Sequence, residues 1–301
     1  MKLAKVAIHF PPYRYTRKQF ADDLAVASRI GHAERVALGA TLERGRESVT
    51  YRVVGNAAAT GKHLHREHAL KMCCEVVGKF ILHDGDLDNL IVCTSSGMLI
   101  PGLAQQVAEG AKFSGLIRTL DIVGAGCGAF FDVLRVLPAF PGTTLVVFVE
   151  VQSALQSFPA DVGRLIVGSF CSDAAAACLF FDHGTYAVRG LKSELCAAEG
   201  YLYDGEKAVF SSNGEVASLP GEPRDDFYCA ASSDFVLDKL VAKFPHLNFD
   251  TADQILRSHG NCGSVGTVLA LQQAIADGSK EFSLASWGPG KTSICTLTHE
   301  S

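Results

Sequence analysis

The chain has 301 residues, of which 48% are hydrophobic and 20% are charged, and its formal net charge is −5. This composition is that of a compact globular protein with two similar halves or one large α/β unit, and not of a disordered or fibrous chain. The acidic balance without a basic stripe argues against a nucleic-acid partner. No secretory leader and no run of roughly 18 apolar residues is visible, so we expect a cytoplasmic protein without a membrane span.

In the first half of the chain, three short apolar runs are bounded by turn residues, which is typical of strands buried on both faces. They span residues 87–95, 143–151 and 174–182. Segments with apolar residues at helical spacing lie before and between them. These segments span residues 65–82, 101–113 and 128–140, the last of which should end at Pro138. The pattern predicts a central parallel or mixed sheet.

The second half of the chain repeats this order of elements. Its predicted elements are a strand at 185–195, helices at 235–244 and 263–278, and a closing strand at 291–299. The alternation predicts layered α/β/α packing and is compatible with two sheets around shared central helices. The polar, Gly- and Pro-rich segment 203–226 is predicted to be a surface excursion.

Cys127 lies in the stretch DIVGAGCGAFFDVLRVL, residues 121–137, with three glycines close to it and an amphipathic segment after it. Glycines permit a tight turn from strand to helix. A thiol there faces unpaired N–H groups and the positive end of the helix dipole, which should lower its pKa below roughly 8.5 and make it a nucleophile. The alternative is a packed apolar residue, because the chain has ten cysteines, which we expect to be reduced. We favour the nucleophile.

Two further glycine-rich stretches follow later in the chain. Asn261, in HGNCGSVGTVLAL (259–271), lies at a helix start, where its amide could cap the helix or donate into a cavity. WGPGKT (287–292) is by itself a turn before the last strand. Its end resembles a phosphate-binding loop, but Ala285 stands where the first glycine is required, so we reject nucleotide binding.

The segment HLHREH contains three histidines near a helix start, His63, His65 and His68. Side chains three positions apart share a helix face and could bind a metal ion. A solvated polar face is the better interpretation, and we expect no metal site.

Five stretches, in this order, resemble the thiolase-like condensing enzymes, in the branch of 3-oxoacyl-ACP synthase III and the chalcone synthase-like type III polyketide synthases. They are TSSGMLIPG (94–102), DIVGAGCGA (121–129), GSFCSDAAAA (168–177), HGNCGS (259–264) and WGPG (287–290). The resemblance implies an α/β, five-layered αβαβα fold built from two duplicated halves. We place the halves at 1–182 and 183–301, and the family is usually homodimeric.

The resemblance also implies roles for individual residues. Cys127 would carry an acyl group, and Asn261 would polarise the carbonyl of the incoming thioester. The Cys127 N–H and the loop of Gly288, Pro289 and Gly290 would form the oxyanion hole, in which each donor is worth about 10²–10³ in rate. The residues assigned to the substrate pocket are Ser95, Ile100, Cys171, Ala230 and Ala231. Cys171 replaces the usual gatekeeper aromatic, no cofactor is expected, and the substrate is an acyl-CoA or acyl carrier protein thioester.

The chain departs from the family at its catalytic histidine. The corresponding stretch, FYCAASSDFVLDKL (227–240), places Ala230 or Ala231 there, and no histidine occurs between His183 and His246. In the family this histidine helps to stabilise the enolate that forms when a malonyl thioester loses CO₂. Losing one such donor should cost roughly 2.7–4 kcal/mol, so decarboxylative condensation should suffer more than acyl transfer.

Three functions are therefore open. The favoured one is an acyl-thioester transferase of fatty-acid or polyketide-type secondary metabolism. The second is a non-catalytic or half-catalytic subunit that forms a heterodimer with a complete ketosynthase. The third is a decarboxylating ketosynthase that uses another donor.

Overall fold

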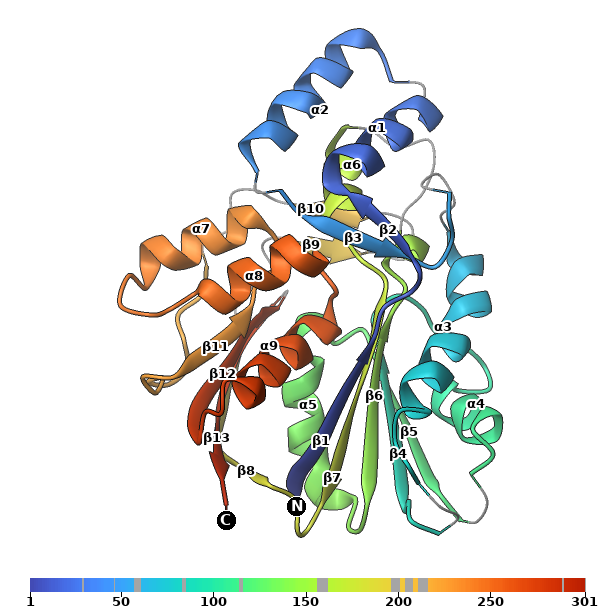
Figure 1. Cartoon of the computed structure of the whole chain (residues 1–301), viewed down its shortest axis with the longest axis vertical. Coiled ribbons are helices and arrows are strands. Elements are labelled where there is room, and N and C mark those ends of the chain that lie inside the picture. Colours follow the sequence, from blue (N-terminus) through green and yellow to red (C-terminus); the bar gives the residue numbers. More distant parts are fainter. Residues whose placement is uncertain are drawn as a thin grey trace.

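The structure, a computed structural model, describes residues 1–28, 30–45, 47–56, 61–82, 85–113, 116–155, 162–195, 201–203, 208–210, 216–288 and 290–300. Its main feature is a mixed nine-stranded sheet of order β11-β12-β13-β8-β1-β7-β6-β4-β5 (Figure 1). These strands are β1 (Lys2–His9), β4 (Asn89–Thr94), β5 (Arg118–Val123), β6 (Thr144–Glu150), β7 (Ala174–Phe181), β8 (Tyr186–Leu195), β11 (Phe227–Ala230), β12 (Glu281–Gly288) and β13 (Lys291–His299).

The sheet consists of two parts that meet at a short junction. Strands β5, β4, β6, β7 and β1 form one part, and β8, β13, β12 and β11 form the other. At the junction β1 pairs with β8 through only two residue pairs, Lys2 with Ala187 and Leu3 with Tyr186. The two parts diverge from there and enclose helices between them (Figure 1).

Helices cover both outer faces and fill the space between the two parts. Helices α3 (Lys62–Val77) and α4 (Leu103–Gly110) cover the first part of the sheet, and α7 (Asp234–Lys243) and α8 (Asp250–His259) cover the second (Figure 1). Helices α5 (Ala129–Val136) and α9 (Ser264–Ala276) lie between the two parts. The resulting order is α-β-α-β-α, as expected from the resemblance.

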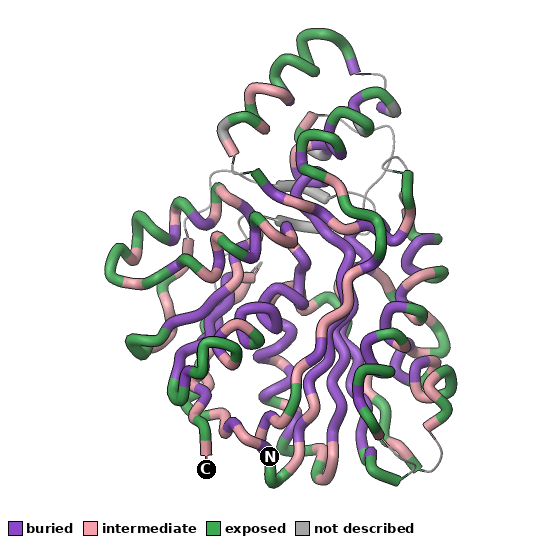
Figure 2. The backbone as a smooth tube through the Cα atoms, in the orientation of Figure 1, coloured by how far each residue is buried: buried purple, intermediate pink, exposed green. Residues whose placement is uncertain are grey.

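The predicted strands and helices agree with the structure. The runs at 87–95, 143–151 and 174–182 contain β4, β6 and β7, and every residue of β4 and β6 is buried. The helix expected to end at Pro138 is α5, which is followed by the 3-10 turn η2 (Leu137–Ala139). Strands can be buried in this way because the helical layers exclude water from both faces (Figure 2).

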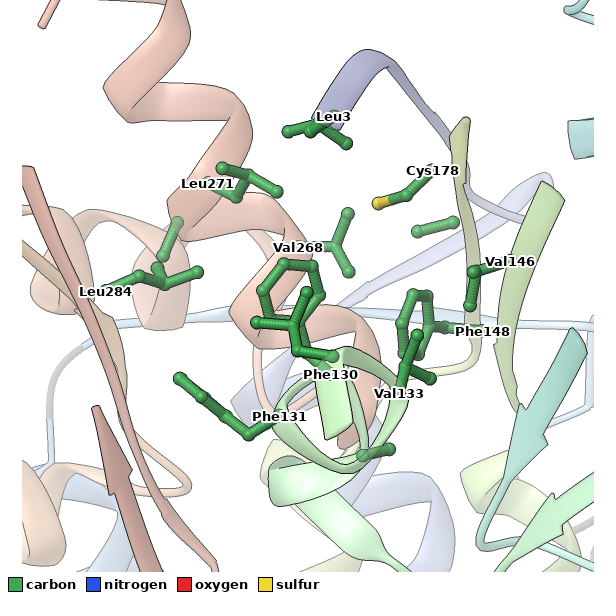
Figure 3. Packing of buried hydrophobic residues seen from close by; sticks show 14 of the residues in the cluster. Leu3, Phe130, Phe131, Val133, Val146, Phe148, Cys178, Val268, Leu271 and Leu284 are labelled. Atoms are coloured by element: carbon green, nitrogen blue, oxygen red, sulfur yellow. The ribbon is translucent and has the colours of Figure 1, made fainter. Parts of the chain in front are cut away.

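The largest apolar cluster lies in the central layer. Phe130 of α5 and Val268 of α9 are fully buried between the two parts of the sheet, together with Phe148, Cys178 and Leu284 (Figure 3). Because side chains from both halves interdigitate here, α5 is held rigidly at the end that carries Cys127.

A further group of elements lies at one end of the molecule and was not predicted from the sequence. It comprises α1 (Arg17–Ala27), α2 (His32–Arg44), α6 (Val162–Phe170), the strand pair β2 (Tyr13–Thr16) and β3 (Val49–Arg52), and the pair β9 (Tyr201–Tyr203) and β10 (Ala208–Phe210). Arg52, 2% exposed, lies over the Phe20 ring at 4.0 Å and donates to the backbone oxygen of Gly168 at 2.7 Å.

Two sequence-based expectations concern the surface. In the expected surface excursion 203–226, residues 204–207 and 211–215 lie outside the described residues, and residues 216–226 are partly or fully exposed. In the described ranges no helix combines the length and the apolar character required to cross a membrane.

Candidate active site

The glycine turn before α5 has the predicted geometry. Cys127 lies in a single 3-10 turn, η1 (Gly126–Gly128), directly before the first residue of α5. Gly124 and Gly126 have φ angles of 79° and 56°, which residues with a Cβ rarely adopt. The N–H of Gly126 donates to Ser95 Oγ at 2.8 Å. The expected strand-to-helix turn is confirmed.

Elements of the second half hold this turn. The backbone oxygen of Cys127 accepts hydrogen bonds of 3.0 Å from Thr267 Oγ1 on α9 and from Ser286 Oγ on β12. A Cβ added to Gly288 would lie 3.4 Å from the backbone nitrogen of Gly128, so the end of β12 packs directly on the cysteine turn. Gly290 follows with a φ of 73°, and Pro289 lies outside the described residues.

Asn261 also lies close to this region and is fixed by three hydrogen bonds. Its N–H donates to Phe170 O at 2.6 Å and its backbone oxygen accepts from the Ser172 N–H at 2.8 Å, and these two bonds form an isolated bridge with Cys171. Its Oδ1 accepts from the N–H of Gly263, the residue that precedes α9, at 2.9 Å. The side-chain oxygen therefore stabilises the turn before α9, while the amide NH₂ is the group that can donate to a ligand. Asn261 is therefore not the cap of α9, whose N-cap residue is Gly263, and its side-chain oxygen holds the turn before that helix.

Of the remaining expected pocket residues, the structure brings some together and separates others. Ala230, at the end of β11, pairs with Ser286 and lies 3.1 Å from the position of a Cβ on Gly266 of α9. Ala231 is 7% exposed and packs in the outer apolar cluster under α7 and α8. Ile100 is 91% exposed, because it lies in the loop before α4, and it does not join the cluster around Cys127 in its own chain.

Cys127 is partly exposed, whereas most of the other cysteines in the described part of the chain are not. Of the nine cysteines in the described part of the chain, seven are buried, and Cys74 and Cys127 are partly exposed. A cysteine that only fills space in the core is normally fully buried, as the other seven are. This exposure is that of the residue as a whole, because the thiol itself is buried.

The expected lowering of the Cys127 pKa is wrong. Burial of the thiol and the nearby Glu150 carboxylate raise the pKa of Cys127 to about 12, whereas its own backbone N–H acts in the opposite direction. The free-energy cost of removing a thiolate from water is larger than the stabilisation that the N-terminus of α5, a helix of eight residues, gives to a negative charge. In its resting state the site holds a protonated thiol.

Glu150 was not recognised from the sequence. It ends β6, is 0% exposed, and accepts hydrogen bonds from Ser264 Oγ at 2.6 Å, the Ser264 N–H at 3.3 Å and the Ser95 N–H at 3.1 Å. Burial raises the pKa of Glu150 to about 7, and these hydrogen bonds oppose the rise. The sequence did contain one indication of this residue, a single carboxylate at the end of the apolar run TLVVFVE. A charged residue in such a buried strand is rare and therefore indicates a special role.

The histidines of the HLHREH segment do not form one solvated face. His65 is 2% exposed and shares a hydrogen bond of 3.2 Å with Thr94 Oγ1, and burial lowers its pKa to about 4. His63 remains exposed. The solvated-face interpretation is therefore wrong for His65, because α3 turns this residue toward the end of β4. Within the described ranges, no group of three or more His, Cys, Asp or Glu residues could hold a metal ion.

Comparison with known proteins adds two solved structures of the same architecture. The 1,3,6,8-tetrahydroxynaphthalene synthase of Streptomyces coelicolor A3(2), a bacterial type III polyketide synthase, superimposes with a TM-score of 0.81, 17% identity and coverage of 100% of both chains. The chain has a thiolase-like fold. The C-terminal type III polyketide synthase domain of Steely1 from Dictyostelium matches this thiolase-like chain with a TM-score of 0.81, 15% identity and 99% coverage of both.

Sequence comparison gives relatives of the thiolase-like chain as well. A 3,5-dihydroxyphenylacetyl-CoA synthase of Amycolatopsis balhimycina is 31% identical over 195 residues, which cover 59% of this chain and 50% of the relative. The synthase of the same name from Amycolatopsis orientalis is 27% identical over 195 residues, which cover 59% of this chain and 51% of the relative. The matched region thus spans about half the length of these relatives. No protein-family model matches the chain.

Proposed function

We propose that this chain is a cytoplasmic acyl-thioester transferase of secondary metabolism, in which Cys127 takes an acyl group from acyl-CoA or an acyl carrier protein and passes it to an acceptor. The observation that carries the proposal is that the partly exposed Cys127 lies in a turn held by Thr267 and Ser286 of the second half. Such a rigid setting is required to align a nucleophile with a carbonyl carbon. The names of the relatives, CoA synthases and polyketide synthases, support a thioester as substrate.

The remaining residues receive roles in the same reaction. The Cys127 N–H and the loop of Gly288 to Gly290 would stabilise the oxyanion, and the NH₂ of Asn261 would donate to the thioester carbonyl. In this scheme the half at 1–182 supplies the nucleophile, and the half at 183–301 supplies Asn261 and the loop. Each fixed donor contributes about 10²–10³ in rate. The transfer requires no bound cofactor or metal ion.

Decarboxylative condensation should be weak. Either Ala230 or Ala231 takes the position expected for the histidine, and a methyl group cannot donate a hydrogen bond to an enolate. With a malonyl thioester, we expect release of CO₂ at least about 10² slower than acyl transfer from a simple donor.

Intact-mass measurement tests the proposal. The purified protein is incubated with acetyl, hexanoyl, phenylacetyl and malonyl thioesters of CoA and of an acyl carrier protein, and we expect an adduct of the acyl mass with at least one donor. Cys127→Ser should abolish the adduct, whereas Cys74→Ser, which replaces the other cysteine that is partly exposed in the described part of the chain, should retain it. Absence of an adduct with every donor, on CoA and on carrier protein, contradicts the proposal.

We further propose that a second copy of the chain covers the free edge of the sheet at β5. Among the described residues the strand pairs with β4 alone, and its Val123 is 47% exposed. Two other exposed apolar side chains, Met98 at 72% and Ile100 at 91%, lie in the loop that follows β4. An uncovered strand edge next to apolar side chains favours association.

Light scattering on the eluting protein tests this assembly. We expect twice the chain mass for the wild type and one chain mass for Val123→Lys combined with Ile100→Asp. Exposed Val36→Lys on α2 serves as the control and should not change the mass. A monomeric wild type contradicts the homodimer. A homodimer that forms the acyl adduct on its own contradicts the alternative of a partner subunit for a complete ketosynthase.

A further inference from the structure

Glu150 connects the parts of the site that carry its chemistry. Its Oε2 accepts from the N–H of Ser95, and the hydroxyl of the same serine accepts from the N–H of Gly126, next to the nucleophile. Its Oε1 accepts from both donors of Ser264, the first residue of α9. The carboxyl group therefore lies between the turn of Cys127 and the start of α9.

The close approach of the Asn261 turn to Glu150 depends on a glycine. Gly263 has a φ of 58°, and a Cβ on it would lie 2.9 Å from Glu150 Cγ. The backbone that follows Asn261 thus closes directly over Glu150. Burial of a carboxylate that is 0% exposed costs folding free energy, which the hydrogen bonds to Glu150 offset only in part.

The titratable groups around Glu150 are thiols from four different elements. They are Cys93 on β4, Cys127 on η1, Cys171 after α6 and Cys262 before α9, and the Glu150 charge acts on each. Asp173, next to Arg52, also acts on Cys171 and Cys262. Among these four thiols, only that of Cys127 belongs to a partly exposed residue.

A proton that moves from Cys127 to Glu150 would leave the charge of the buried site unchanged. The site then holds one negative charge before the transfer, on the carboxylate, and one after it, on the sulfur. Loss of the proton to solvent would instead place two negative charges in a buried region, which is strongly unfavourable. A base works best when its pKa lies near the working pH, and burial raises the pKa of Glu150 to about 7.

We propose that the Glu150 carboxylate, which hydrogen-bonds to Ser95 and Ser264 and not to Cys127 Sγ, is the catalytic base that takes the proton of Cys127 through one bridging water as this thiol attacks a thioester. The inference rests on the proposed acyl transfer at Cys127. The S–H bond of Cys127 breaks and an O–H bond forms on Glu150, while the sulfur electron pair forms a bond to the acyl carbon. The bond from the acyl carbon to the donor sulfur then breaks with its electrons on that sulfur, which takes the proton from Glu150. The products are acyl-Cys127, a free donor thiol and the Glu150 carboxylate.

The test compares wild type with Glu150→Gln in two reactions of the same sulfur. In single-turnover acylation by the best acyl-CoA donor, the wild-type rate should rise with pH through about 7 and then level off. The Glu150→Gln rate should be lower by about 10²–10⁴ at pH 8 and show no break near pH 7. Alkylation of Cys127 by iodoacetamide at pH 8 should be as fast as in the wild type or faster, because the repelling charge is gone. Glu281→Gln, an exposed carboxylate on β12, is the control and should retain the wild-type profile.

The outcomes separate the two proposals. Absence of an acyl adduct in the wild type contradicts the transferase itself. A Glu150→Gln variant that acylates as fast as the wild type, or faster, shows that Glu150 only repels the thiolate and overturns its assignment as the base. Slow alkylation together with slow acylation shows that the variant has lost access to the sulfur, which also overturns it. Glu150→Asp keeps a carboxylate and should recover the break in the pH profile.

Discussion

Ser286 Oγ on β12 donates a hydrogen bond of 3.0 Å to the backbone oxygen of Cys127, so a strand from the end of the chain holds a turn formed 159 residues earlier. Thr267 Oγ1 donates to the same oxygen at 3.0 Å. The two hydroxyls link the cysteine turn to both the central helix α9 and the second part of the sheet. The position of Cys127 therefore depends on segments far along the chain.

The paired hydroxyls predict a coupled loss of stability. Ser286→Ala and Thr267→Val should each lower the free energy of unfolding by about 1 kcal/mol. The double variant should lose about 3 kcal/mol, more than the sum, because each single variant keeps one of the two bonds to the Cys127 oxygen. Urea unfolding of the four proteins measures the coupling, and strictly additive losses would show that the two bonds act independently.

Asn261 predicts a separation of stability from activity. Asn261→Ala removes the acceptor for the Gly263 N–H and should lower stability by about 1 kcal/mol as well as slowing acylation by about 10²–10³. Asn261→Asp keeps the acceptor but loses the NH₂, so it should unfold like the wild type and still acylate slowly. Thermal unfolding and single-turnover acylation give the two readouts. Wild-type activity in Asn261→Asp would limit the role of Asn261 to holding the turn before α9.

Replacement by alanine should destabilise the protein by different amounts at the two glycines that flank α9. Gly263 and Gly278 have φ angles of 58° and 75°, but a Cβ on Gly263 meets Glu150 Cγ at 2.9 Å, whereas one on Gly278 meets nothing within 4 Å. Gly278→Ala should cost about 1 kcal/mol from backbone strain alone. Gly263→Ala should cost about 3 kcal/mol or more, because strain and overlap add. Equal denaturant midpoints for the two variants would mean that the turn can move away from Glu150.

Burial of His65 predicts that the free energy of unfolding decreases as the pH is lowered. Burial lowers its pKa from 6.5 to about 4, so the unfolded chain binds this proton at a higher pH than the folded one. Stability is therefore fully present above pH 6.5 and is lost as the pH falls through about 4, by up to about 3 kcal/mol. His65→Gln should flatten the stability profile between pH 6.5 and 4 relative to the wild type. Parallel profiles of the two proteins in urea unfolding would contradict the assignment.

Local patterns were sufficient for many elements. The strands β4, β6 and β7 follow from unbroken apolar runs, since only a strand covered on both faces has this pattern in so few residues. The turn of Cys127 follows from its glycines, because positive φ angles at Gly124 and Gly126 require them. The elements α1, α2, β2 and β3 at one end of the molecule were not predicted, because their apolar residues show no clear helical or alternating period.

The amino-acid sequence by itself determined the strands β4, β6, β7, β8 and β13, the helices α3, α4, α5, α7 and α9, the glycine turn before α5 and the residue types at the site, because these depend on contacts and dihedral preferences within a few residues. Only the tertiary structure decided that Glu150 lies near Cys127, that the pKa of this thiol is raised and that Ile100 lies outside the cluster. The physical reason is that desolvation and charge coupling depend on which distant segments exclude water from a group. A local sequence pattern does not show which distant segments will exclude water from a residue.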